Sequence, residues 1–303
     1  MHAIEISSVT KRFGTVTAVD DLSLSVPAGC VYGFIGPNGS GKTTTLRMIM
    51  SILYPDSGSI RVLGEERRQA CNDRIGYLPE ERGLYRKMRV RDMLQFYGRL
   101  RAAADVNREV DYWLERMDLA PWADKKVEAL SKGMSQKVQF IAAVVPRPEL
   151  VILDEPFTGL DPVNTDVLQQ VVLELQANGT TVIFSTHDMN TAENMCDFIF
   201  MIFRGRKVLD GALTEIQDRY GSDTVRVRIE GETGLLRGVP GVERVTDRGH
   251  LQELRLAHGS DSQQVLEAIA ARARITHFEL ARPSLHDIFV RIAGPEGEET
   301  GDA

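Results

Sequence analysis

Residues 36–43 have the composition and spacing of a loop that wraps around phosphate groups, although a glycine-rich surface turn is an alternative. They read Gly-Pro-Asn-Gly-Ser-Gly-Lys-Thr, match the pattern G-x-x-x-x-G-K-[ST], and lie between an apolar stretch at 31–35 and a helical pattern at 42–53. Glycines let backbone N–H groups turn inward toward phosphate oxygens, and the start of the helix adds its positive dipole end. Lys42 would supply a cation and Thr43 a hydroxyl for Mg²⁺. The residues expected to contact the phosphates are Gly36, Pro37, Asn38, Gly39, Ser40, Gly41, Lys42, Thr43 and Thr44.

Two adjacent acids follow the apolar run 150–153. Sheets of the α/β class place ligands at the carboxyl ends of their strands, so Asp154 and Glu155 are expected beside the phosphate loop. Neighbouring side chains on a strand point in opposite directions, which gives the two acids different roles. Asp154 suits Mg²⁺, directly or through water, and Glu155 suits the general base that deprotonates an attacking water. The alternative is that both acids cap the following helix.

Two further segments place polar residues at the ends of predicted elements. The apolar strand at 180–186 ends at His187, which is expected to contact the γ-phosphate, with a purely structural histidine as the alternative. In 130–136, which precedes a helix, Ser131 is expected to be the N-cap and Gly133 to allow close approach of the backbone. The residues expected to act in the reaction are Lys42, Glu155 and His187.

The composition excludes several classes of protein. The chain has 303 residues, 43% of them hydrophobic and 26% charged, and its net charge of −7 argues against binding nucleic acid or anionic lipid through bulk charge. Its three cysteines, Cys30, Cys71 and Cys196, lie far apart without metal-ligand spacing, which fits inert thiols in a reducing compartment. No apolar run approaches the roughly 20 residues that span a bilayer, and the N-terminus lacks a signal segment, so a membrane role would need a partner.

The order of the elements indicates an α/β fold. Short apolar strands alternate with amphipathic helices, which predicts a parallel sheet covered on both faces. A helical insert is expected at about 89–145. After a break near 220, the segment 221–293 predicts a small α+β domain, and 294–303, with four acids and no base, predicts a solvated tail.

The order of the motifs resembles that of the ATP-binding subunit of ABC transporters over about residues 3–220. The shared sequence features are the phosphate loop, the helical insert, LSKGMSQ, ILDEP, TGLDP and STHD. The resemblance implies that 1–220 forms a P-loop NTPase cassette with an antiparallel β-subdomain, a mostly parallel core sheet and a helical subdomain. It also implies hydrolysis of Mg-ATP between two cassettes packed head to tail, in a homodimer or a pseudo-homodimer.

The resemblance assigns roles to five residues outside the phosphate loop and the acidic strand end. Ser131 and Gly133 would contact the nucleotide of the second cassette, and Asp161 would lie in a loop that communicates across the dimer. Phe13 would stack on adenine, with packing inside the β-subdomain as the alternative. Glu80 occupies the place of a glutamine that contacts Mg²⁺ and the attacking water.

The chain departs from the family pattern at two places. Lys132 stands where the commonest signature has glycine, and Met134 stands where it has glutamine. At Glu80 a carboxylate can still ligate Mg²⁺, although it adds a negative charge beside the γ-phosphate. The residues expected to hold the metal are Thr43, Glu80 and Asp154.

The resemblance also implies a partner and a location. The segment 221–293 is similar to the C-terminal extension of exporter-type cassettes, and LPEERGLY with LSKGM is similar to cassettes grouped with sodium or drug efflux. These features imply a peripheral protein at the cytoplasmic face of the cell membrane that powers a separate transmembrane permease subunit for export, without a nucleic-acid partner.

Between residues 82 and 101, seven basic residues accompany one acid and are expected to dock the permease, with a solvated helix face as the alternative. They are Arg82, Arg86, Lys87, Arg89, Arg91, Arg99 and Arg101.

Two other functions compete with this hypothesis. A soluble ABC-type ATPase acting on nucleic acid or ribosomes would usually show two cassettes in one chain, a long heptad insert or zinc-binding cysteines, and the sequence shows none of them. A nucleotide sensor without turnover would not need a base at the position of Glu155. The sequence does not indicate the transported substrate.

Overall fold

The computed structural model describes residues 2–66, 73–81, 83–101, 105–220, 224–231, 233–247, 249, 251–257 and 259–293. Cys71, Arg82, the predicted break at 221–222 and the predicted acidic tail at 294–303 lie outside the described residues. The chain divides into two compact units, Met1–Ala212 and Leu213–Ala303. Among the described residues, no helix is both long enough and apolar enough to cross a bilayer.

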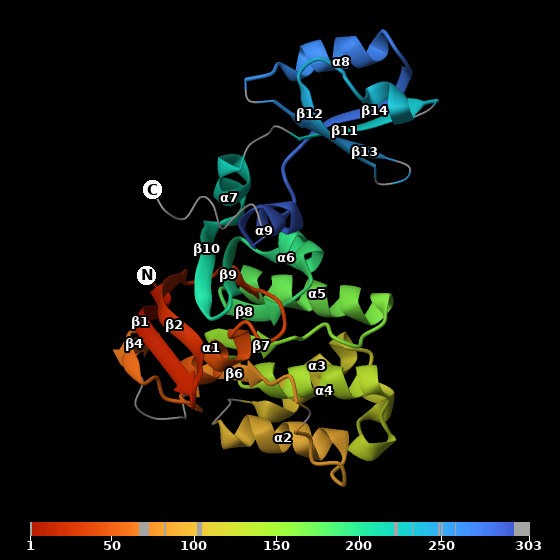
Figure 1. Cartoon of the computed structure of the whole chain (residues 1–303). Helices are drawn as coiled ribbons and strands as arrows, with labels where there is room; N and C mark the ends of the chain where they lie inside the picture. The colour runs from red at the N-terminus through yellow and green to blue at the C-terminus, as the bar shows by residue number, and fades with distance from the viewer. Residues whose placement is uncertain are drawn as a thin grey trace. The chain divides into compact units, whose positions relative to one another are not determined.

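The first unit is built on a six-stranded core sheet of order β10-β9-β3-β8-β7-β6 (Figure 1). Its strands are β3 (Val31–Ile35), β6 (Ile75–Leu78), β7 (Leu150–Asp154), β8 (Thr181–Thr186), β9 (Phe198–Phe203) and β10 (Arg206–Ala212). All neighbouring pairs are parallel except β10 with β9. Every residue of β3, β7 and β8 is buried, as expected for parallel strands covered on both faces. The predicted mostly parallel sheet is confirmed.

A second sheet in this unit is antiparallel and has the order β2-β1-β4-β5. Its strands are β1 (His2–Phe13), β2 (Val16–Pro27), β4 (Ser57–Val62) and β5 (Glu65–Glu66). The β1–β2 ladder runs, with register shifts, from the pair His2 and Pro27 to the pair Phe13 and Val16. One apolar core joins the two sheets and includes Ile6, Leu24, Phe34, Ile152 and Phe200. The predicted antiparallel subdomain is confirmed.

In the described part of the first unit, six helices accompany the two sheets. They are α1 (Lys42–Ile49), α2 (Val90–Leu100), α3 (Val106–Arg116), α4 (Lys132–Val144), α5 (Pro162–Ala177) and α6 (Met189–Met195), with short 3₁₀ turns at Ala120–Trp122 and Val127–Ala129. Helices α2, α3 and α4 pack against one another beyond β6 (Figure 1) and form the predicted helical subdomain. The prediction of a first helix reaching residue 53 is wrong. The helix ends at Ile49 because the chain turns at Ser51, whose φ is 55°.

The second unit is a small α+β fold. A four-stranded antiparallel sheet of order β12-β13-β11-β14 packs with α8, and its core includes Val225, Val227, Leu254, Val265 and Ile269. Its elements are α7 (Leu213–Arg219), β11 (Thr224–Glu230), a 3₁₀ turn at Thr233–Leu236, β12 (Val242–Asp247), β13 (Gln252–Leu256), α8 (Ser262–Ala270), β14 (Arg274–Ala281) and α9 (Leu285–Ala293). Helix α7, which the sequence analysis places in the first domain, groups with this unit.

Phe34→Ala is expected to destabilise the first unit by about 3–5 kcal/mol, because Phe34 is fully buried and its ring contacts Tyr32 and Phe200. Urea unfolding followed by tryptophan fluorescence measures the change, since Trp113 and Trp122 both lie in this unit. The control Ile52→Ala, at a side chain that is 52% exposed, should cost under about 1 kcal/mol. Equal losses in the two variants would contradict the assignment of Phe34 to the core.

Candidate functional site

The phosphate loop connects β3 to α1, and local sterics determine its conformation. A Cβ atom at Gly36 would lie 2.3 Å from the carbonyl oxygen of Ile202, and one at Gly41 would lie 2.5 Å from that of Ala18. Gly41 also has a φ of 111°, which side chains rarely allow. The Ser40 carbonyl accepts a 2.9 Å hydrogen bond from the Gly205 N–H, which ties the loop to the turn after β9. The loop therefore requires glycine at both positions.

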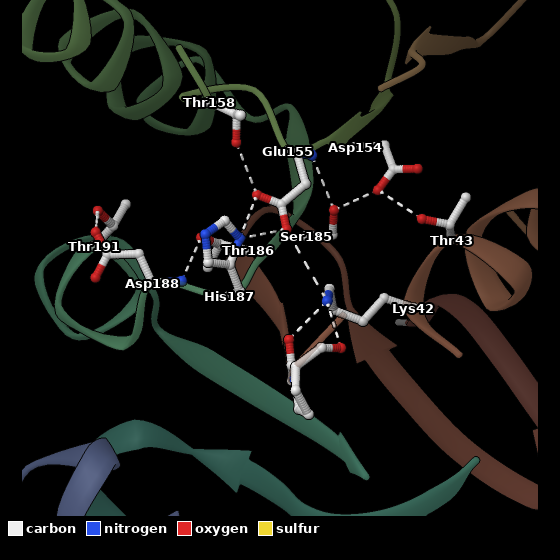
Figure 2. A network of polar contacts seen from close by, with 12 residues as sticks. Lys42, Thr43, Asp154, Glu155, Thr158, Ser185, Thr186, His187, Asp188 and Thr191 are labelled. Carbon is white, nitrogen blue, oxygen red and sulfur yellow. Dashed lines mark hydrogen bonds and ion pairs between the residues drawn. The ribbon is translucent and has the colours of Figure 1, made fainter. Parts of the chain in front are cut away.

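Lys42 places its ammonium group inside this loop. Its Nζ donates to the carbonyl oxygens of Gly36 at 2.6 Å and Pro37 at 3.1 Å, and lies 4.0 Å from Oε1 of Glu155 (Figure 2). Burial lowers the pKa of Lys42, and the charges of Glu155, Asp154 and Glu80 oppose that shift. The cation is thus held between the loop carbonyls and the acids that follow β7.

Asp154 ends β7 and is 1% exposed. Its Oδ1 accepts hydrogen bonds from Ser185 Oγ at 2.5 Å and from Thr43 Oγ1 at 3.3 Å (Figure 2). Within the part of the chain that the structure describes, its buried Oδ2 has no hydrogen-bond partner. An unpaired carboxylate oxygen beside a hydroxyl fits Mg²⁺, which takes oxygen ligands and is often bound by one or two carboxylates together with substrate phosphates.

Glu155 leaves the strand in a left-handed conformation, with a φ of 50°. The side chains of Asp154 and Glu155 therefore point in different directions because the backbone turns at Glu155. The sequence analysis expected this from the alternation of side chains along a strand, but β7 ends at Asp154. A non-glycine residue in this region costs on the order of 1–3 kcal/mol and persists where its surroundings hold it. The N–H of Glu155 donates to Ser185 Oγ at 2.9 Å, so one hydroxyl binds both acids.

Three groups surround the carboxylate of Glu155, whose side chain is 10% exposed. His187 Nδ1 lies 3.0 Å from Oε1 and 3.1 Å from Oε2, and Thr158 Oγ1 donates to Oε2 at 3.0 Å (Figure 2). Lys42 is the third group. The structure thus brings His187 to the predicted base, and its contact with a γ-phosphate stays a prediction.

Glu80 follows β6 and is exposed, and its backbone is held from both sides by one buried residue. Gln139 of α4 donates from Nε2 to the carbonyl oxygens of Pro79 at 3.3 Å and Glu81 at 3.1 Å. The charge of Glu80 also acts on Lys42, where it opposes the lowering of the pKa by burial. The charge of Glu80 is thus one of three acidic charges that act on the lysine of the phosphate loop.

The remaining predicted residues lie on other elements. Ser131 caps α4 by accepting the N–H of Met134 at 3.2 Å, and Asp161 caps α5 by accepting that of Asn164 at 3.1 Å. Hydrogen bonds from Asn164 lower the pKa of Asp161. Phe13 is 48% exposed, and the Lys11 ammonium lies 5.6 Å from the centroid of its ring. In the described residues, no hydrogen bond or ion pair links Phe13, Ser131 or Asp161 to the phosphate loop.

Three residues of the site were not predicted from the sequence. Ser185 binds both acids, Thr158 binds the carboxylate of Glu155, and Gln139 holds the segment around Glu80. Ser185 and Thr158 carry a detectable signal, since they are the first residues of the motifs STHD and TGLDP. Gln139 carries no comparable signal.

Comparison with known proteins gives consistent matches. Residues 19–158 match the family model described as "ABC transporter", and residues 211–293 match "ATP-binding protein DrrA1-3-like, C-terminal domain". The chain is 41% identical to the uncharacterized ABC transporter ATP-binding protein YhaQ of Bacillus subtilis, over 96% of this chain and 98% of that protein. It is 36% identical to the Nod factor export ATP-binding protein I of Paraburkholderia xenovorans, over 98% and 99% of the two chains.

A solved structure described as an ATP binding subunit of an ABC transporter superposes with a TM-score of 0.68 at 28% identity. The match covers 72% of this chain and 93% of that one. The similarity to known proteins therefore includes both the sequence and the arrangement of the elements.

Lys42→Ala is expected to weaken ATP binding about 10- to 100-fold, because a hydrogen bond to a charged group contributes about 1.5–3 kcal/mol. Isothermal titration calorimetry measures the change. Lys125→Ala, which removes an exposed lysine from the same unit, is the control and should bind ATP like the parent. Parental affinity in Lys42→Ala would contradict the placement of the triphosphate in this loop.

Proposed function

The chain belongs to the ABC transporter family as an ATP-hydrolysing subunit, and from this premise we propose that it closes around Mg-ATP as a dimer and drives export through a transmembrane partner. The observation that supports the catalytic part of the proposal is the hydroxyl of Ser185, which binds Asp154 and the backbone of Glu155 at once. Because Ser185 binds both residues, the proposed metal ligand Asp154 and the proposed base Glu155 are held next to each other. Nζ of Lys42 lies 4.0 Å from Oε1 of Glu155.

The side chains divide the work of hydrolysis. Lys42 and the N–H groups of the phosphate loop would bind the β- and γ-phosphates, while Thr43 and Asp154 would hold Mg²⁺, with Glu80 as a further candidate ligand. Mg²⁺ bound there would neutralise charge that develops on the phosphates. Glu155 accepts the proton of the attacking water on its carboxylate, and His187 orients that carboxylate from Nδ1.

A second copy of the chain completes the proposed site. Ser131 and Gly133 lie at the start of α4, a 13-residue helix without an acid in its first turn, so its N–H groups and dipole suit an anion. These residues make no contact with the phosphate loop of their own chain in the described residues. We infer that they contact the nucleotide held by the partner copy, with Asp161 beside them. Phe13, exposed at the end of β1, would stack on adenine.

The docking surface for the transmembrane partner is proposed to follow Glu80. It combines an aromatic cluster of Tyr85, Phe96 and Tyr97, whose ring centroids lie 5.7–6.3 Å apart, with exposed basic side chains. Those exposed are Arg86, Lys87, Arg89 and Arg99. Such a surface fits a membrane-embedded partner with apolar and acidic groups at its cytoplasmic side.

Two residues of the predicted basic stretch also have partners inside the first unit. Arg91 forms an ion pair with Asp111 of α3, and Arg101 donates to the carbonyl oxygen of Ile75 in β6. Arg91 therefore joins two helices of the helical subdomain, and Arg101 joins that subdomain to the core sheet. The docking of the permease by the basic stretch stays a prediction.

The proposals of export and of a peripheral membrane location are supported by the similarity of this chain to known proteins. The second unit matches the C-terminal domain of a DrrA-like ATP-binding protein, and a relative of nearly equal length is named for Nod factor export. We propose that this chain also serves an exporter, at the cytoplasmic face of the membrane.

Glu155→Gln is expected to lower ATP turnover by on the order of 10²-fold or more, because the amide cannot accept the proton of water. ATP affinity should be kept, and the ATP-bound variant should accumulate as a dimer. Phosphate release, calorimetry and light scattering after size exclusion measure the three properties. Glu115→Gln, at an exposed position of α3, is the matched control. Turnover at the parental rate in Glu155→Gln would rule out this residue as the base.

The double charge reversal Arg86→Glu and Lys87→Glu should prevent assembly with the membrane partner, because it replaces attraction by repulsion at the proposed surface. Co-purification of the partner from membranes measures assembly, and ATP binding by the isolated subunit should stay unchanged. Arg61→Glu with Arg108→Glu makes the same change in charge at exposed residues elsewhere in the first unit. Unchanged assembly in the Arg86 and Lys87 variant would discard the docking surface.

A further inference from the structure

The carboxylate of Glu155 needs an orientation that its backbone does not provide. The terminal torsion of a glutamate side chain is broad and nearly two-fold, so its two oxygens are equivalent unless neighbours distinguish them. His187 Nδ1 does not distinguish them, since it lies 3.0 Å from Oε1 and 3.1 Å from Oε2. Thr158 does, because its hydroxyl donates to Oε2 alone, at 3.0 Å.

The position of this hydroxyl is fixed by the turn that carries it. The N–H of Thr158 donates to the carbonyl oxygen of Glu155 at 3.3 Å, so the turn closes on the residue whose side chain it binds. Phe157 anchors the turn through an edge contact with the buried ring of Phe184, at 5.5 Å between centroids. Ser185 holds the start of the turn at the N–H of Glu155. Thr158 therefore presents its hydroxyl from a backbone that is secured on both sides.

We propose that Thr158 is a positioning residue that occupies Oε2 of Glu155 and so assigns Oε1 to the attacking water. Oε1 is the oxygen that faces Lys42, whose Nζ lies 4.0 Å away (Figure 2). The proton of the water is then accepted on the side of the carboxylate where the triphosphate is bound. The inference rests on the proposed role of Glu155 as the base.

Removal of this hydroxyl should affect turnover more than substrate binding. Without Thr158 the plane of the carboxylate is held less firmly, so a smaller fraction of bound complexes has an oxygen aimed at the attacking water. We expect Thr158→Val, which keeps the shape of the side chain, to lower kcat about tenfold and to leave the KM for ATP within about twofold. Thr158→Ser, which restores the hydroxyl, should keep the parental kcat.

Thr191→Val is the matched control. Thr191 also donates from its hydroxyl to a nearby carboxylate, that of Asp188 at 2.7 Å, but it does not bind Glu155. Its loss should leave kcat unchanged. Thermal unfolding of all variants should match the parent because Thr158 is exposed, and Thr158→Ala provides the same test if the valine methyl group disturbs the turn.

The steady-state ATPase assay, run with Glu155→Gln alongside, separates the outcomes. A tenfold lower kcat in Thr158→Val, with recovery in Thr158→Ser, supports the proposal. Parental kcat in Thr158→Val overturns the proposal, and so do equal losses of kcat in Thr158→Val and Thr158→Ser. In either case, an inactive Glu155→Gln variant would still support the proposed function. Parental turnover in Glu155→Gln would instead remove the base and, with it, the basis of this inference.

A second measurement tests whether Thr158 acts within its own chain. In the Glu155→Gln background, addition of Thr158→Val should leave the ATP-dependent dimer as abundant as before, measured by light scattering. A weaker dimer would show that Thr158 serves the contact between copies, which overturns its assignment as a positioning residue.

Discussion

The hydroxyl of Ser185 is the contact on which the site depends. It is fully buried on β8, donates to the carboxylate of Asp154 and accepts the N–H of Glu155, so that one small side chain fixes the end of β7 in two ways. A buried hydroxyl that uses both its donor and its acceptor capacity is a specific constraint, since either bond left unmade would cost about 1–3 kcal/mol. It also holds Glu155 in the left-handed conformation that separates the base from the residue beside the metal site.

Helix α4 connects this site to the rest of the cassette. Its start is capped by Ser131, and two buried glutamines farther along hold different parts of the nucleotide site. Gln136 donates to the carbonyl oxygen of Pro156, directly after the base, and Gln139 donates to the carbonyls on either side of Glu80. The same rigid helix therefore supports the segment proposed to face the second copy, the base, and the segment that leads to the proposed docking surface.

Much of the site could be predicted from the sequence because its main parts are contiguous. The phosphate loop and the acids after β7 are short motifs whose chemistry follows from residue type and from their place between strand and helix. The bond from Ser185 to Asp154 could not be predicted, since it depends on β7 and β8 being neighbours in the sheet. The internal partners of Arg91 and Arg101 were not predicted either. The sequence alone does not show which arginines of a basic stretch form ion pairs or hydrogen bonds inside the protein and which are exposed. The helical insert was predicted from periodicity and the antiparallel subdomain was implied by the resemblance to a family, whereas the order of the strands was not predicted.

The most direct test of the central claim is a crystal structure of the Glu155→Gln variant with Mg²⁺ and ATP. If the account is right, the γ-phosphate lies between the ammonium of Lys42 and the side chain at position 155, Mg²⁺ lies on the side of Thr43 and Asp154, and Ser185 keeps both of its bonds. A triphosphate bound away from residues 36–43, or a metal remote from Thr43 and Asp154 while Ser185 still joins the two strands, would contradict it.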